Sequence, residues 1–282
     1  MARSARVLPL TPPRESSREF LTELARAFGG AILFALPISM TTEMWWLGTN
    51  LESWRVALLL SFAVPLLVVL SYYIGFRESF SVEEDVVDAF VALAVGFVAA
   101  AASLLLFSVI EFGMSADEII GKIALQTVPA SLGAILAAGQ LGQGKRQRQE
   151  RSRGYVAELV YMLVGALYLA LNLAPTDEIV LISLQFTPWH ALVIMALSLT
   201  IMHAFVYAVE FQGQEERPED ASFWSVFLRF TVVGYAVALL MCLFILWLFG
   251  RTSGETPAQV LLMMTVLGLP ASIGAAAARL VL

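Results

Sequence analysis

The sequence is poor in the residues that most enzymes use for catalysis. Its 282 residues include one cysteine, Cys242, and two histidines, His190 and His203. One cysteine cannot form a disulfide within the chain or a cysteine metal cluster, and two histidines cannot build a multi-histidine metal site. The short motifs of zinc proteases, serine hydrolases and phosphate-binding loops are also missing. We therefore expect no metal and no cofactor and disfavour catalysis, with an intramembrane Ser–His pair as the one enzymatic alternative left open.

Charged residues are scarce as well. They make up 14% of the chain, whereas 59% of the residues are hydrophobic; a typical soluble domain has about 25% charged residues. The net charge of −6 argues against nucleic-acid binding, which needs a basic surface. This composition indicates a polytopic integral membrane protein whose main contact is the lipid bilayer.

Eight apolar runs are long enough to cross a hydrocarbon core, which takes roughly 20 helical residues. They predict an all-α bundle of eight transmembrane helices, with the long third and seventh helices tilted. The expected spans are Ala27–Gly48, Arg55–Phe76, Val86–Phe112, Ile119–Leu141, Tyr155–Ala174, Trp189–Phe211, Phe223–Phe249 and Ala258–Leu282.

Basic residues gather on one side of this predicted bundle. Residues 1–26 hold five arginines and no apolar run typical of a signal peptide, and residues 142–154 hold five further Lys or Arg residues. The positive-inside rule makes that side cytoplasmic, so we expect both termini inside. The expected organisation is a cytoplasmic N-terminal arm (1–26), a first four-helix unit (27–141), a basic cytoplasmic linker (142–154) and a second four-helix unit (155–282).

The two halves of the chain resemble each other. Gly30–Glu43 aligns with Gly165–Glu178 at a spacing of 135 residues, and Pro129–Ala134 recurs 141 residues later as Pro270–Ala275. Each half contains four expected spans, an even number, so both halves cross the membrane in the same direction. The sequence therefore predicts a parallel 4+4 tandem repeat about an axis along the membrane normal.

Glu43 and Glu178 are matched carboxylates near the outer ends of the first and fifth spans, and we expect them at similar depths. A carboxylate near hydrocarbon is costly and needs a partner or water. One interpretation is a cation or proton entry site around the repeat axis. The other is structural, because Arg55 and His190 occupy matched places across the short outer loops and could form interfacial pairs with these two acids.

Pro129 and Pro270 lie in the middle of the fourth and eighth spans. Proline removes a backbone hydrogen bond there and kinks the helix. The freed carbonyls need water, Ser131 or Ser272, or a ligand. Such helices could line a central pathway, or they could pack closely through small neighbours such as Gly133.

His203 lies within the sixth span and has no polar counterpart, since Val68 occupies the matched position. It is either a buried ring bonded to a neighbouring hydroxyl or a proton relay, because histidine titrates near neutral pH. Gln126 and Asn172 are expected to form ordinary hydrogen bonds between helices.

The stretch Thr41–Gly48, which contains Glu-Met-Trp-Trp, and Ala35-Leu36-Pro37 before it carry a resemblance. From about Arg18 onward the chain resembles a bacterial family of multi-pass integral membrane proteins of unknown function. The resemblance implies a protein of the bacterial cytoplasmic (inner) membrane and carries over no substrate, cofactor or catalytic residue. The second half has Val180-Leu181 in place of the Trp pair, so any role of that pair would be asymmetric.

These observations favour a transporter or channel for a small ion or solute, with its path along the interface between the repeats. The alternative is a non-transporting scaffold or sensor subunit that presents its basic linker and charged inner loops to another protein or to anionic lipids. The chain could also form a homo-oligomer or bind a membrane partner. A hydrated cavity between the halves would favour transport there. An interface packed throughout by Ala and Leu would exclude it in that state.

Overall fold

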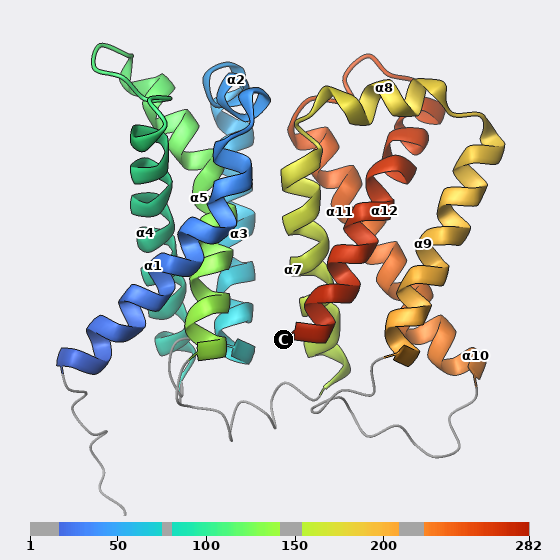
Figure 1. Cartoon of the computed structure of the whole chain (residues 1–282), viewed down its shortest axis with the longest axis horizontal. Coiled ribbons are helices and arrows are strands. Elements are labelled where there is room, and N and C mark those ends of the chain that lie inside the picture. Colours follow the sequence, from blue (N-terminus) through green and yellow to red (C-terminus); the bar gives the residue numbers. More distant parts are fainter. Residues whose placement is uncertain (1–16, 75–80, 142–153, 209–222, 282) are drawn as a thin grey trace, which may run out of the picture.

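The computed structural model describes residues 17–74, 81–141, 154–208 and 223–281 (Figure 1). Within these ranges the chain forms helices joined by turns, without strands, and eight of the helices are long and apolar enough to cross a membrane. The all-α class and the eight spans are thus confirmed. Residues 1–16 of the expected arm and 142–153 of the basic linker lie outside the described residues.

The described part of the first half forms five helices, and α5 lies at their centre. α5 contacts α1, α2, α3 and α4, and it is the most buried of the eight spans. The bounds are α1 Ser17–Ser39, α2 Thr42–Asn50, α3 Ser53–Ile74, α4 Val82–Leu106 and α5 Ala116–Leu141.

The second half follows a similar order, with α12 packed against α7, α8, α9 and α11. One of its spans is assembled from three consecutive pieces, α10, the π-helix η1 and α11. The bounds are α7 Tyr155–Leu173, α8 Asp177–Gln185, α9 Pro188–Ala208, α10 Phe223–Val226, η1 Phe227–Val232, α11 Val233–Leu248 and α12 Pro257–Val281.

The expected first span, Ala27–Gly48, is wrong at its outer end. The spanning helix α1 ends at Ser39, and Thr41 is extended before the separate helix α2 begins. The side chain of Thr41 donates a hydrogen bond to the carbonyl of Pro37, which fixes the turn. α2 and α8 are each nine residues long and lie at the same end of the molecule (Figure 1). This is the end that the sequence leads us to expect outside the cell, and we call it the outer end and the opposite one the inner end.

α4 is bounded by local signals. The hydroxyl of Ser81 accepts a hydrogen bond from the backbone N–H of Glu84, as in a capping box. At the other end, the N–H of Val109 bonds the carbonyl of Leu104, and Ser108 has a positive φ of 54°. This pattern is a Schellman motif, which satisfies carbonyls at the end of the helix.

α11 ends with the same motif. The N–H of Arg251 bonds the carbonyl of Leu246, the N–H of Gly250 bonds that of Trp247, and Gly250 has a φ of 75°. Glycine is the usual residue at this left-handed position because it has no side chain to clash. α4 and α11 thus end in equivalent backbone hydrogen bonds, 142 residues apart.

Two pairs of glycines bring helices into backbone contact. A Cβ atom on Gly30 of α1 would overlap the carbonyl oxygen of Gly133 in α5, and one on Gly165 of α7 would overlap that of Gly274 in α12. Small residues at such crossings allow the close approach on which helix association in lipid depends.

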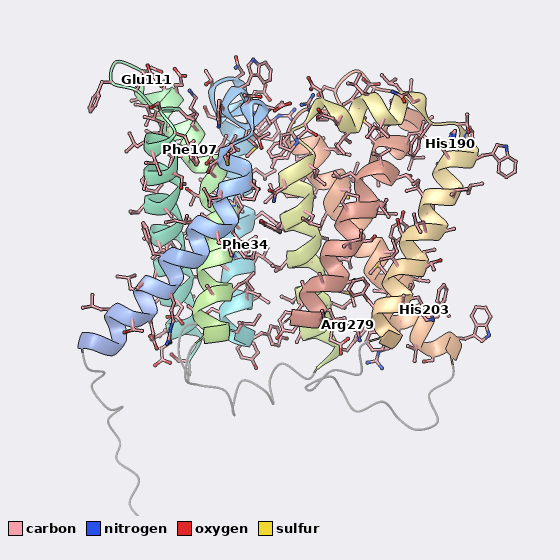
Figure 2. The ribbon with its side chains drawn as sticks, viewed as in Figure 1. Phe34, Phe107, Glu111, His190, His203 and Arg279 are labelled. Carbon is pink, nitrogen blue, oxygen red and sulfur yellow. The ribbon has the colours of Figure 1, made fainter. Side chains whose placement is uncertain are left out.

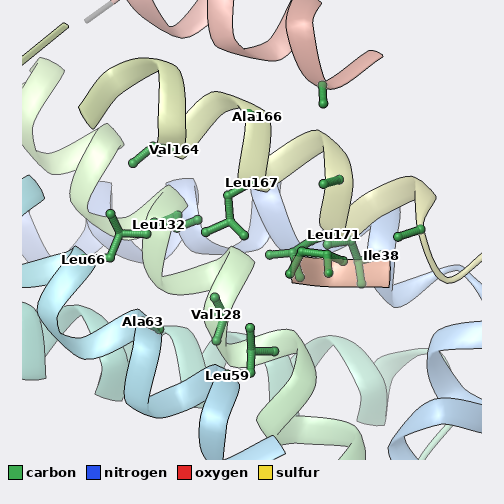
Figure 3. Close-up of a cluster of buried hydrophobic side chains, with 14 of the residues drawn as sticks. Ile38, Leu59, Ala63, Leu66, Val128, Leu132, Val164, Ala166, Leu167 and Leu171 are labelled. Atoms are coloured by element: carbon green, nitrogen blue, oxygen red, sulfur yellow. The ribbon is translucent and has the colours of Figure 1, made fainter. Parts of the chain in front are cut away.

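Hydrophobic side chains fill the region where the first half meets α7 (Figure 3). Aromatic rings add to the contact between the halves: the ring centroid of Phe34 lies 4.6 Å from that of Tyr168 in α7, and that of Phe62 lies 4.9 Å from that of Phe244 in α11. The interface between the halves is therefore apolar over much of its depth. The aliphatic residues there include Leu59, Ala63, Leu66, Val128, Leu132, Val164, Leu167 and Leu171.

Candidate functional site

A line of polar side chains runs along α5 from its outer end into the core of the first half. Glu118, Lys122 and Gln126 are spaced four residues apart, which places them on one face of the helix. Lys122 is 6% exposed and Gln126 is fully buried. We call these three residues, with Ser39 of α1, the polar line.

Lys122 is held by several acceptors. Its Nζ lies 2.6 Å from Oε1 of Glu118 and donates to the carbonyl of Val109 at 3.4 Å. The hydroxyl of Thr49, in α2, also donates to Oε1 of Glu118. A buried ammonium group is costly unless it is paired, and this carboxylate supplies the compensating charge.

α2 is seated directly on this part of α5. A Cβ atom on Gly121 would overlap the carbonyl oxygen of Gly48, and one on Gly48 would lie 2.6 Å from Cα of Lys122. The short outer helix therefore covers the polar line where it begins.

Gln126 ends the polar line in the core. The hydroxyl of Ser39 donates to its Oε1 at 2.5 Å, and Nε1 of Trp45 donates to the carbonyl of Ser39 at 2.7 Å. Nε2 of Gln126 is buried and has no partner among the described residues. Whichever way the amide is turned, one end meets Ser39 and the other lacks a protein partner, at a cost of about 1–3 kcal/mol. Such an open group calls for an explanation, such as a ligand.

Four of the predicted residues lie at the outer end: Glu43, Arg55, Glu178 and His190. They do not form the interfacial pairs Glu43–Arg55 and Glu178–His190. Nε of Arg55 lies 2.8 Å from Oε2 of Glu52, and its Nη1 donates to carbonyls at the end of α11. Glu52 directly precedes α3, whereas Glu43 belongs to the separate α2, which explains the different partner. The hydrogen bond from Arg55 holds the pKa of the Glu52 carboxyl below its ordinary value.

The two predicted acids lie outside the polar line. Glu43 is half-buried and accepts a hydrogen bond from the hydroxyl of Thr42, while Glu178 is exposed at the start of α8. His190 accepts a hydrogen bond at Nδ1 from the backbone N–H of Thr187. The two acids lie at the same end of the molecule, as their helices do.

Pro129 lies in α5, one turn past Gln126, and the helix continues through it. Its missing N–H frees the carbonyl of Leu125. Ser131 does not satisfy that carbonyl, because its hydroxyl donates to the carbonyl of Thr127 at 2.6 Å. Of the alternatives left open for the freed carbonyl, water and a ligand remain, because Ser131 bonds elsewhere.

The arrangement in α12 is similar. Pro270 frees the carbonyl of Val266, but the hydroxyl of the buried Ser272 donates to the carbonyl of Leu269 at 2.7 Å. Both serines bond carbonyls of their own helices a few residues back, which is where a serine side chain in a helix naturally reaches.

His203 contacts the π-helix η1. Its Nδ1 lies 2.9 Å from the hydroxyl of Thr231, and its ring meets that of Phe227 edge-on at 5.1 Å. The contact matches the hydroxyl-bonded interpretation. His203 lies toward the inner end of α9, with His190 at the opposite end (Figure 2). Single-turn π segments are frequent at functional sites.

A buried ion pair joins α7 to α12 in the second half. Nε of Arg279 lies 2.8 Å from Oε2 of Glu158, and both side chains are less than 10% exposed. The guanidinium also stacks on Phe230, 4.4 Å from the ring centroid. The pair lies toward the end of the molecule where α12 ends (Figure 2).

Lys122, Glu158 and Arg279 are not among the site residues predicted from the sequence. All three carry a charge inside an expected span, which is the usual signal of a functional or paired group in a membrane protein. Gln126 does bond another helix, as expected, whereas Asn172 bonds the carbonyl of Tyr168 in its own helix.

Among the described residues, no group of three or more histidine, cysteine, aspartate or glutamate side chains is placed to hold a metal ion. Searches of the curated proteins and of the solved structures gave no match to the chain. A family model described as "Putative integral membrane protein (DUF2391)" matches residues 23–282. The chain therefore belongs to this family of multi-pass integral membrane proteins, the kind of family that its Glu-Met-Trp-Trp stretch resembles.

Proposed function

We propose that this protein transports a small ion or polar solute across a bacterial cytoplasmic membrane, and that the polar line forms the outer part of the route. The observation that carries the proposal is the open amide end of Gln126, which is buried beneath Lys122 in a mostly apolar core. Polar and charged groups at membrane depth mark solute pathways because they are otherwise too costly to keep.

The proposed route differs from a path between the halves. The interface there is filled by aliphatic and aromatic side chains in this conformation (Figure 3). The aliphatic side chains there offer a polar solute no hydrogen-bonding partner, whereas α5 offers a series of donors and acceptors one helical turn apart.

We also propose that the two halves are a parallel 4+4 repeat with both termini in the cytoplasm. The equal lengths of α2 and α8, the equivalent ends of α4 and α11, and the two glycine crossings support the repeat. The start of α1 and the end of α12 lie at the same end of the molecule (Figure 1), which supports termini on one side. The basic residues of the arm and linker favour the cytoplasm for that side.

The polar line is present in the first half only. At the spacing of 141 residues, Gln259, Met263 and Leu267 occupy the places of Glu118, Lys122 and Gln126. The second half therefore has no equivalent line, and its counterpart residues define matched substitutions for a test.

The test is solute flux into liposomes that contain the purified protein, measured over a panel of cations, anions and small metabolites. For a transported solute, Lys122→Met and Gln126→Leu should each lower the flux at least about tenfold, a barrier increase of about 1.4 kcal/mol. These variants introduce the residues that the second half already carries. Glu178→Gln, at an exposed position away from the polar line, is the control and should leave the flux unchanged.

Two results would contradict the proposal. Unchanged flux in both variants would remove the polar line from the route. Absence of flux over the whole panel, together with one partner protein that co-purifies in a fixed ratio, would favour the scaffold or sensor function instead.

A further inference from the structure

The interface between the halves joins different faces of two similar units. In the first half α3 supplies Phe62, which stacks on Phe244 of α11. Arg55 of α3 donates to the carbonyls of Trp247 and Leu248 at the end of α11. α3 therefore packs on α11.

A two-fold relation between the halves would also place α9, the counterpart of α3, against α4, the counterpart of α11. Instead, α4 and α9 lie at opposite edges of the molecule (Figure 1). The contact is thus heterologous, which means that it joins two different surfaces, one from each half. Because each half carries a version of both surfaces, one version of each stays outside the contact.

Both unused surfaces are exposed and apolar. On α9, Trp189 is 76% exposed, and on α4, Leu106 is 80% exposed. Trp189 is the counterpart of Trp54, whose ring lies 5.9 Å from that of Trp247 in the internal contact. Further exposed residues are Leu192, Val193 and Leu197 on α9, and Phe97, Val98 and Leu105 on α4.

The polar part of the internal contact also has a counterpart. Because α4 and α11 end in equivalent motifs, the carbonyls of Leu105 and Leu106 correspond to those that Arg55 bonds. His190 occupies the position of Arg55. Since the N–H of Thr187 donates to its Nδ1, the neutral ring carries its proton on Nε2 and is a donor.

We propose that a second copy of this chain docks on these surfaces, with α9 of one copy against α4 of the next. The contact repeats the packing of α3 on α11, with His190 donating to the end of the neighbour's α4. The proposal rests on the repeat proposed above and is independent of transport. A head-to-tail contact of this kind builds either a closed ring or an open chain.

The test is thiol cross-linking in native membranes, in a chain whose own cysteine is replaced (Cys242→Ala). His190→Cys combined with Leu106→Cys should give products of two or more copies with a short bifunctional thiol reagent. Neither single-cysteine variant should give them. When the membranes are diluted with excess lipid, the yield of cross-linked product should fall as the copies dissociate.

The matched control is the internal contact. Arg55→Cys with Leu248→Cys occupies the equivalent positions and should link the two halves of one chain, read out by cleavage at a protease site inserted in the segment 142–153. If this control links and the His190–Leu106 pair gives only monomers, the proposal is overturned. Dimers from His190→Cys alone would overturn it too, because they would place α9 against α9.

Discussion

The two halves of this chain share a helical framework, but each places a buried cation, Lys122 in the first half and Arg279 in the second, at an opposite end of the molecule. In the first half, the polar line begins at the outer end, below α2, with Lys122 and Gln126. In the second half, the buried ion pair of Glu158 and Arg279 lies toward the inner end. The glycine crossings and the short outer helices are thus common to both halves. The positions of the buried charged side chains differ, and they depend on single residues of α5, α7 and α12.

The largest effect is expected from the inner ion pair. Arg279→Met leaves the buried carboxylate of Glu158 without its arginine, which should lower the free energy of unfolding by about 3–5 kcal/mol. Unfolding in detergent micelles, followed by circular dichroism, measures the loss. The double variant Glu158→Leu/Arg279→Met should recover most of it. A single variant as stable as the parent chain would show that the pair does not hold α7 to α12.

The glycine crossings test how similar the two frameworks are. Gly30→Ala and Gly165→Ala each place a methyl group against a facing carbonyl, so each should destabilise by about 1–3 kcal/mol. Gly29→Ala is the control, because a Cβ atom there meets nothing within 4 Å. If only one of the two substitutions lowers the free energy of unfolding, the two crossings do not stabilise their halves equally.

The contact of His203 with η1 belongs to the second half alone. Removal of its hydrogen bond by Thr231→Val should cost about 1 kcal/mol of unfolding free energy. A double-mutant cycle with His203→Phe should give a coupling energy of similar size. Additive effects of the two substitutions would show that the ring and the hydroxyl act independently.

The smallest effect concerns the matched contacts before α3 and α9. Glu52 bonds Arg55, and its counterpart Thr187 bonds His190. The pKa of Glu52 is lowered, so its stabilising contribution is present above the ordinary pKa of glutamate and is lost as the pH falls through the lowered value. Glu52→Gln should abolish this part of the acid dependence of unfolding, while Thr187→Val should leave it in place.

The sequence predicts the framework well because each spanning helix must satisfy its own backbone within about 20 apolar residues. It misses α2, since a nine-residue helix next to a longer one looks like a continuation of the same apolar run. It misses α8 for another reason, because Asp177–Gln185 falls in the expected outer loop between two spans. Only the turn at Thr41, fixed by a hydrogen bond to Pro37, separates α2 from α1.

The candidate site was harder to predict because its contacts join residues far apart in the chain. Ser39 and Gln126 are 87 residues apart, and Glu158 and Arg279 are 121 apart. The local signal was available at Lys122, which follows Glu118 by one turn inside an expected span. The interpretation that pairs Arg55 with Glu43 depends on a first span that runs through Glu43, whereas Glu52, directly before α3, is the carboxylate that Arg55 bonds.

The glycine crossings also have a mechanical consequence. Where the backbones of α1 and α5 touch at Gly30 and Gly133, no side chain can change rotamer to let one helix slide past the other, and the same holds for Gly165 and Gly274 in α7 and α12. We therefore expect the two helices of each pair to move together. Contacts made by side chains, among them the leucine-rich surface between the halves, are where we expect a rearrangement of the helices to be accommodated.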